Sequence, residues 1–101
     1  MGRARASTLL LLLTLAAPAV AQDTVTIASW NVWNLGADSA VEDRAGVIAQ
    51  FDIVALQEVE AIAGLDRLLS QVESDTGIDW AYVVSTRVGE GNAAEYYAFI
   101  Y

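Results

Sequence analysis

The chain has 101 residues, of which 55% are hydrophobic, a formal net charge of −8, and neither cysteine nor histidine. Disulfides, thiolate metal sites and cysteine nucleophiles are therefore excluded, and any step that needs an imidazole must use a residue from outside this chain. The acidic balance also argues against nucleic-acid binding driven by a basic surface, unless a divalent cation supplies positive charge locally.

Residues 1–21 have the pattern of a secretory signal peptide. Two arginines precede a short apolar core over residues 9–17, and small residues occupy the positions that a signal peptidase reads before Gln22. Because this core is much shorter than the roughly 20 residues of a membrane-spanning helix, we expect no stable membrane anchor. We expect a secreted or periplasmic protein that is cleaved near Ala21 and Gln22, and residues 22–101 then carry a formal charge of −10.

The rest of the chain is predicted to alternate between strands and helices. The first strand covers residues 24–31, and the turn that follows it ends at Asp38 or Ser39, either of which can cap a helix running to about Gln50. Residues 53–57 form a continuous apolar run, which is typical of a strand that is covered on both faces. Four residues are spaced to form the buried face of the helix: Val41, Ala45, Ile48 and Ala49.

The second half of the chain continues with one helix and two strands. We expect strands over residues 80–85 and 96–101, separated by the polar loop 86–94, which is too short for a helical crossover. The fold is therefore predicted to be a layered α/β fold with a mixed sheet. The last strand leaves an apolar edge, so we expect a truncated part of a longer domain. The helix is predicted over residues 65–74 from the spacing of Leu65, Leu68, Leu69 and Val72.

Glu58 is the first candidate for a chemical role. It directly follows the apolar strand, and open α/β sheets place their ligand crevices at the carboxyl ends of strands. A single carboxylate there suits Mg²⁺ or Mn²⁺, which take one or two protein carboxylates and keep several waters. The alternative is that Glu58 caps the second helix or is simply solvated.

Asn31 and Glu95 are two further candidates. Asn31 ends the first strand, and parallel pairing would bring it to the same edge as Glu58, where its amide can donate to a phosphate oxygen. The alternative is an asparagine that starts a turn, the role that also suits Asn34. Glu95 opens the last strand and could accept a hydrogen bond from an imidazole, while the alternative is a solvated strand start.

Three segments of the chain match one known pattern. They are Ile27-Ala28-Ser29-Trp30-Asn31-Val32, then Asp52-Ile53-Val54-Ala55-Leu56-Gln57-Glu58-Val59, then Tyr82-Val83-Val84-Ser85 with Glu95-Tyr96-Tyr97-Ala98-Phe99-Ile100-Tyr101. Together they resemble the endonuclease/exonuclease/phosphatase family, and within it the secreted deoxyribonuclease I-like enzymes. The resemblance covers essentially all of residues 22–101 and keeps the order of the motifs.

The resemblance implies a fold, a site and an activity. Residues 22–101 would be the N-terminal half of a four-layered α/β sandwich with a mixed sheet, and the missing C-terminal half would supply histidines. Glu58 would be the metal ligand, Asn31 would lie at the metal and the phosphate, and Glu95 would position a catalytic histidine. The implied cofactor is Mg²⁺, with Mn²⁺ or Ca²⁺ as substitutes. The implied activity is hydrolysis of phosphodiester bonds, with nucleic acid as the leading substrate class.

Three positions depart from that pattern. Glu60, Glu90 and Ala93 stand where deoxyribonuclease I itself uses two arginines and a tyrosine in the DNA minor groove. These differences remove contacts or reverse their charge, so RNA, lipid and small phosphodiester substrates stay open beside DNA. The alternative from another class is a non-catalytic, truncated or binding remnant of the fold. The isolated chain is expected to show no turnover.

Overall fold

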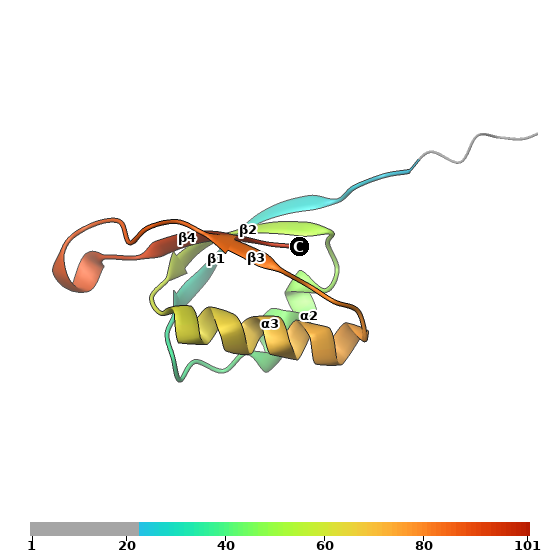
Figure 1. The fold of residues 1–101 in the computed structure, drawn as a ribbon, viewed down its shortest axis with the longest axis horizontal. Helices are drawn as coiled ribbons and strands as arrows, with labels where there is room; N and C mark the ends of the chain where they lie inside the picture. Colours follow the sequence, from blue (N-terminus) through green and yellow to red (C-terminus); the bar gives the residue numbers. More distant parts are fainter. Residues whose placement is uncertain (1–22) are drawn as a thin grey trace, which may run out of the picture.

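The computed structural model describes residues 23–101 as a four-stranded sheet with two α-helices on one face (Figure 1). The signal-peptide prediction for residues 1–21 lies outside the described residues. Neither helix within residues 23–101 has the length and apolar character needed to cross a bilayer. In chain order the elements are β1 (Ile27–Leu35), α2 (Glu42–Ile48), β2 (Ile53–Val59), α3 (Ile62–Thr76), β3 (Tyr82–Val84), a 3₁₀ turn (Gly91–Ala93) and β4 (Tyr96–Ile100).

The sheet is mixed, as predicted. Its strand order is β1-β2-β4-β3, in which β1 and β2 are parallel and β4 runs antiparallel to both of its neighbours. The β1–α2–β2 unit provides the helical crossover that parallel strands require, whereas the connection from β3 to β4 is a loop. Residues 23–101 therefore form a two-layered α/β unit, with the helices in one layer and the sheet in the other.

The core lies between the sheet and the two helices. Ala45 and Ile48 of α2 and Leu65, Leu68 and Val72 of α3 are fully buried, which confirms the predicted inner faces of both helices. They pack against alternate residues of the strands, as the period of two in a strand requires. The predicted Ala49 and Leu69 are only partly buried. For Ala49 the reason is its position as the C-cap of α2, beyond the last regular turn.

The predicted cap of α2 is wrong. The helix begins at Glu42 with Val41 as its N-cap, and no side chain makes a capping hydrogen bond there. The Ser39 hydroxyl instead accepts a hydrogen bond from the Gly36 N–H (2.9 Å) and donates to the Asn34 carbonyl (3.2 Å). Ser39 therefore closes the turn that follows β1, and this use of its oxygen leaves the helix without a side-chain cap.

The prediction that β2 is covered on both faces is not met within residues 23–101. Val54 and Leu56 are buried beneath the helices, whereas the intervening Ile53, Ala55 and Gln57 are only partly buried. No element of the described part of the chain covers that second face (Figure 1). Large apolar residues are therefore exposed across it: Ile27 of β1, Val83 of β3, and Tyr97 and Phe99 of β4.

A hydrogen-bonded clamp holds the entry to β1 against the entry to β2. The Asp52 carboxylate accepts from the Thr26 N–H (2.8 Å) and from the Thr26 hydroxyl (3.0 Å). These two bonds, the backbone one first, lower the pKa of Asp52 below its ordinary value. The clamp fixes the register in which Ile27 pairs with Ile53, and thus the register of the residues that follow.

The turn after β1 is held tightly against α3. A Cβ atom on Gly64 would lie 2.3 Å from the Gly36 carbonyl oxygen, so only glycine allows this approach. Arg67, one turn further along α3, donates to the carbonyls of Ala37 (2.9 Å) and Ser39 (2.7 Å). The C-terminal end of β1 therefore enters a turn whose position is fixed by contacts with α3.

The two glycines of the helices are expected to respond oppositely to alanine. Gly64→Ala forces backbone apart and should lower the free energy of unfolding by about 1–3 kcal/mol. At Gly46 an added Cβ atom would meet nothing within 4 Å. Gly46→Ala should therefore raise the free energy of unfolding by up to about 1 kcal/mol, because alanine has the higher helix propensity. Urea unfolding of the two variants measures both values. Equal effects would show that α3 does not contact the Gly36 turn in this way.

Candidate functional site

The pairing of β1 with β2 is interrupted beside Glu58. Between the pairs Asn31–Gln57 and Leu35–Val59, β1 has three residues and β2 has Glu58 alone. Extra residues of this kind form a β-bulge, which breaks the ladder, bends the strand and changes the direction of side chains. Bulges are concentrated next to active sites, so this interruption makes the region around Glu58 a candidate site.

The pairing of β2 with β4 is interrupted at the same level. Between the pairs Leu56–Ala98 and Val59–Tyr96, β2 has two residues and β4 has only Tyr97. The ladder of β2 is thus irregular on both sides at one position. Backbone groups that a regular sheet would use for pairing are available there for other contacts.

Three residues at this position have left-handed backbone conformations. They are Trp33 (φ 52°), Asn34 (φ 50°) and Glu58 (φ 61°), and no other non-glycine residue within residues 23–101 has a positive φ. Such a conformation costs an L-residue about 1–2 kcal/mol, and it persists where the surrounding structure fixes it. In a regular strand Glu58 would point to the same face as Leu56, into the core. The bulge instead gives the buried position to Val59 and leaves Glu58 partly exposed.

Asn31 and Glu58 line one depression at this end of the sheet, together with Trp33 and Asn34. Its volume is about 390 Å³. The parallel pairing of β1 with β2 therefore brings the two predicted residues to a common edge. Glu58 does not cap α3, because the N-cap of that helix is Ala61 and no side chain makes a capping hydrogen bond there.

The hydrogen bonds of Asn31 show how the depression is organised. Asn31 Oδ1 accepts from the Trp33 N–H at 2.8 Å, which is the local bond of an asparagine that starts a turn. The turn role considered from the sequence is therefore real. Within residues 23–101 the Asn31 NH₂ group donates no hydrogen bond, so its two N–H bonds can be directed at a ligand in the depression.

Asn34 links the two strands at Glu58. Its N–H donates to Glu58 Oε2 at 3.3 Å. With its side-chain nitrogen facing the carboxylates, Asn34 also donates to Glu58 Oε2 at 3.3 Å and to Glu60 Oε1 at 3.1 Å. Two acidic side chains are thus gathered around one amide, and the Glu58 carboxylate is held within reach of the depression.

Arg44 of α2 supports the irregular end of β1. Its Nε donates to the Val32 carbonyl and its Nη2 to the Trp33 carbonyl, both at 3.0 Å, and its Nη1 donates to the Ala40 carbonyl. A planar guanidinium with five donors can satisfy several carbonyls at once, which a lysine cannot do. Sequence reasoning missed this residue, since an arginine on the polar side of a helix carries no signal of which carbonyls it will meet.

Glu95 lies away from the depression. Its backbone pairs with Val88 through two hydrogen bonds of 2.8 Å. Its carboxylate accepts a hydrogen bond from the Tyr97 hydroxyl, which raises the pKa of Tyr97 above its ordinary value. Tyr97 is the β4 residue whose backbone lies opposite the bulge of β2. The predicted role of Glu95 beside a histidine stays a prediction, because the chain has no histidine.

The oxygen donors that line the depression provide some, but not all, of the ligands that a hard divalent cation needs. Within residues 23–101 no three acidic, histidine or cysteine residues gather to hold a metal ion. The depression has one carboxylate, from Glu58, and the amides of Asn31 and Asn34. Mg²⁺ is often bound through one or two carboxylates and several waters, so these residues could supply part of its coordination sphere.

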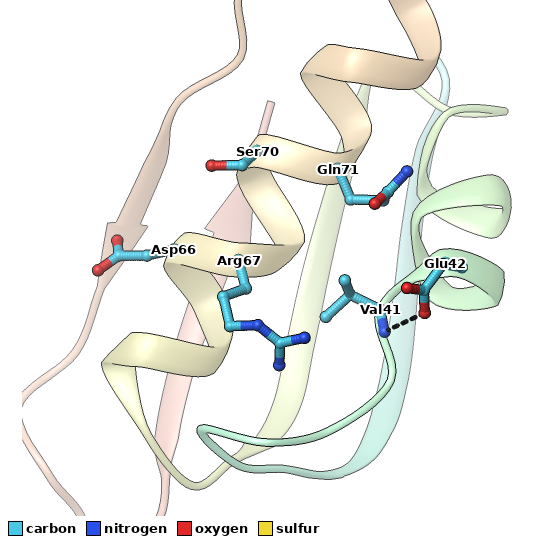
Figure 2. Close-up of a pocket in the computed structure, with 6 residues that line it drawn as sticks. All are labelled: Val41, Glu42, Asp66, Arg67, Ser70 and Gln71. Atoms are coloured by element: carbon cyan, nitrogen blue, oxygen red, sulfur yellow. Dashed lines mark hydrogen bonds between the residues drawn. The ribbon is translucent and has the colours of Figure 1, made fainter.

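A second depression lies between the start of α2 and α3 (Figure 2). Its charged groups are already engaged in the fold: the Glu42 carboxylate accepts from the Val41 N–H at 3.1 Å, Asp66 accepts from the Tyr82 hydroxyl at 2.6 Å, and Arg67 holds the turn after β1. Its role is therefore structural. The lining residues are Val41, Glu42, Asp66, Arg67, Ser70 and Gln71.

Comparison with known proteins gives one similarity that bears on function. No family model matches the chain. The chain is 36% identical over 95 residues to a protein named deoxyribonuclease from Thioalkalivibrio sp. (strain K90mix). The matched region is 90% of this chain and 26% of that protein, so the chain spans about a quarter of the length of this relative. The matched region of this chain includes most of the helices and strands described above. It corresponds to one part of the protein named deoxyribonuclease.

Substitutions at Arg44 should reveal how much the turn depends on it. Arg44→Ala leaves three carbonyls without their donor and should lower the free energy of unfolding by about 1–3 kcal/mol. Arg87→Ala removes an exposed arginine and should change it by no more than about 0.5 kcal/mol. Urea unfolding of both variants measures the difference. A harmless Arg44→Ala would mean that the β1 end is held by other contacts.

Replacing Glu58 by glycine and by alanine should separate the effect of backbone strain from the effect of losing the carboxylate. Both variants lose the carboxylate, but only glycine adopts φ 61° without steric cost. Glu58→Gly should therefore be more stable than Glu58→Ala by about 1 kcal/mol. Thermal unfolding of the pair measures this difference, and an alanine variant of equal or greater stability would contradict the left-handed conformation.

Proposed function

We propose that the complete protein is an exported, divalent-metal-dependent phosphodiesterase of the endonuclease/exonuclease/phosphatase family that cleaves nucleic acid. The observation that carries this proposal is the depression in which β1 and β2 bring Asn31 and Glu58 together beside a double interruption of the sheet. The similarity to part of a protein named deoxyribonuclease supports the same reaction class. Residues 22–101 would form the first portion of the catalytic domain.

The uncovered face of the sheet supports a larger domain of the deoxyribonuclease I-like type. In a four-layered sandwich a second sheet packs against the first, and it would cover the apolar side chains exposed on β1, β3 and β4. Apolar patches of this kind are rarely left open in soluble proteins. A further part of such a domain would bury Val83 and Phe99 and would supply histidines, which residues 1–101 lack.

Glu58, Asn31 and Glu95 each have a distinct part in the proposed reaction. Glu58 and the carbonyl oxygen of the Asn31 amide would be ligands of Mg²⁺, which would supply positive charge beside the phosphate. The NH₂ group of Asn31 would donate to a non-bridging phosphate oxygen. Glu95 would orient an imidazole from the missing part, and that imidazole would take the proton of the attacking water.

The electrostatics near the depression bear on the substrate. Glu60 lies within hydrogen-bond reach of Asn34, and both Glu60 and Glu90 are exposed. Acidic side chains at these positions oppose the close approach of a duplex backbone. The similarity to a protein named deoxyribonuclease favours nucleic acid as the substrate. The acidic side chains favour a lipid or small phosphodiester, which would place fewer phosphates near these carboxylates.

Cleavage assays on the protein expressed from its complete reading frame test the proposal. Plasmid DNA and RNA should be cleaved with Mg²⁺ and spared with EDTA. Glu58→Gln and Asn31→Ala should each lower kcat by at least about 100-fold, since the first removes the proposed carboxylate ligand of the metal and the second removes the proposed donor to the phosphate. Asp79→Asn removes an exposed carboxylate outside the depression and should leave the rate unchanged.

Different failures of this assay have different meanings. Full activity in Glu58→Gln would refute the metal assignment. Cleavage of a small phosphodiester or a sphingolipid without cleavage of nucleic acid would favour the alternative substrate classes. Failure to cleave any of these substrates by a folded protein would favour the non-catalytic remnant.

A further inference from the structure

Trp33 is the most exposed aromatic residue beside the depression. The residue has 76% of its surface exposed, and it lines the depression with Asn31, Asn34 and Glu58. Its backbone is left-handed, with φ 52°, and a bulky residue rarely adopts this conformation. Sequence reasoning assigned no role to it, because strand alternation does not predict a tryptophan on the open side of a bulge.

The backbone of Trp33 is fixed by bonds on both sides. Its N–H donates to Asn31 Oδ1 at 2.8 Å, and its carbonyl accepts from Arg44 Nη2 at 3.0 Å. The preceding residue, Val32, is fully buried, and Arg44 holds its carbonyl as well. The large exposed ring is therefore carried on a backbone that neighbouring side chains restrain, in contrast to a side chain on a free loop.

The surroundings of Trp33 suit a planar polar ligand. The other lining residues are two asparagines and a glutamate, and no lysine or arginine of residues 23–101 is among them. A membrane-inserting tryptophan needs apolar neighbours and benefits from basic ones, which this edge lacks. Stacking on a nucleobase needs only the face of the ring, and it adds no charge to an acidic surface.

We propose that Trp33 is a stacking platform for the base next to the scissile phosphate, and that it makes the site selective for unpaired nucleotides. This inference rests on the proposed function and names the form of its substrate. In a duplex both faces of a base are already stacked, so only a single-stranded, frayed or extruded base can meet the ring. Trp33 is then a specificity residue, while Asn31 would donate to the phosphate and Glu58 would be a metal ligand.

Binding to short oligonucleotides tests the stacking directly. The complete protein is titrated, with EDTA present, with a fluorescent single-stranded tetranucleotide and with versions in which one base at a time is replaced by an abasic sugar. For the wild type, removal of the base at one position should weaken binding by about 5- to 150-fold. Trp33→Ala should bind the intact tetranucleotide about 5- to 150-fold more weakly than the wild type does. The variant should bind the intact tetranucleotide and the version lacking that base with equal affinity. Trp33→Phe should keep most of the discrimination.

Two controls separate stacking from other effects. Ile78→Ala removes another exposed apolar side chain, one that is 60% exposed and lies outside the depression, and it should leave the discrimination unchanged. The ratio of wild-type to Trp33→Ala affinity should stay constant between low and high salt, because stacking carries no counterion release. A ratio that collapses in high salt would contradict the proposal.

The remaining outcomes each decide the matter. Equal loss of affinity for intact and abasic oligonucleotides in Trp33→Ala would show a structural role and overturn the inference. Trp33-dependent binding to phosphatidylcholine vesicles without base discrimination would overturn it in favour of a membrane contact. Cleavage with Mg²⁺ is scored separately: cleavage without base-dependent binding overturns only this inference, and base-dependent binding without cleavage overturns only the proposed reaction.

Discussion

The position of the Glu58 carboxylate depends on an interruption of the sheet on both sides of one residue. Regular pairing through β2 would place Glu58 among the core residues beneath the helices, where an unpaired carboxylate is costly. The left-handed conformation at Glu58 and the extra residues of β1 remove that conflict. Val59 and Leu35 then continue the buried face, both with no exposed surface, so the core is preserved across the interruption.

The strain at this edge is balanced by contacts from the helical layer. Arg44 of α2 holds the carbonyls of β1 where the bulge begins, and Arg67 of α3 holds the turn that follows. Gly64 allows α3 to come close to that turn. A site that is restrained in this way keeps its polar groups in place before a ligand arrives, as the proposed phosphate chemistry would require.

Much of the fold could be predicted from local patterns. The helix faces at Ala45, Ile48, Leu65 and Val72 follow from the spacing of apolar residues, and the mixed sheet follows from one short connection. The meeting of Asn31 and Glu58 at one edge follows from parallel pairing. The start of α2 was missed, because a serine three residues before a helix can equally close the preceding turn, as Ser39 does.

The irregular features could not be predicted, because they depend on contacts distant in sequence. A bulge at Glu58 arises from the register on two neighbouring strands at once, and the sequence of β2 itself gives no sign of it. Arg44 and Trp33 acquire their roles only when the turn has been placed against α2 and α3.

A crystal structure of the complete protein grown with Mn²⁺, located by its anomalous scattering, tests the central claim most directly. We predict one ion on the Glu58 carboxylate, next to Asn31 at the edge shared by β1 and β2, with the bulge intact. An ion bound elsewhere, with Glu58 turned to bulk solvent and separated from Asn31, would contradict it.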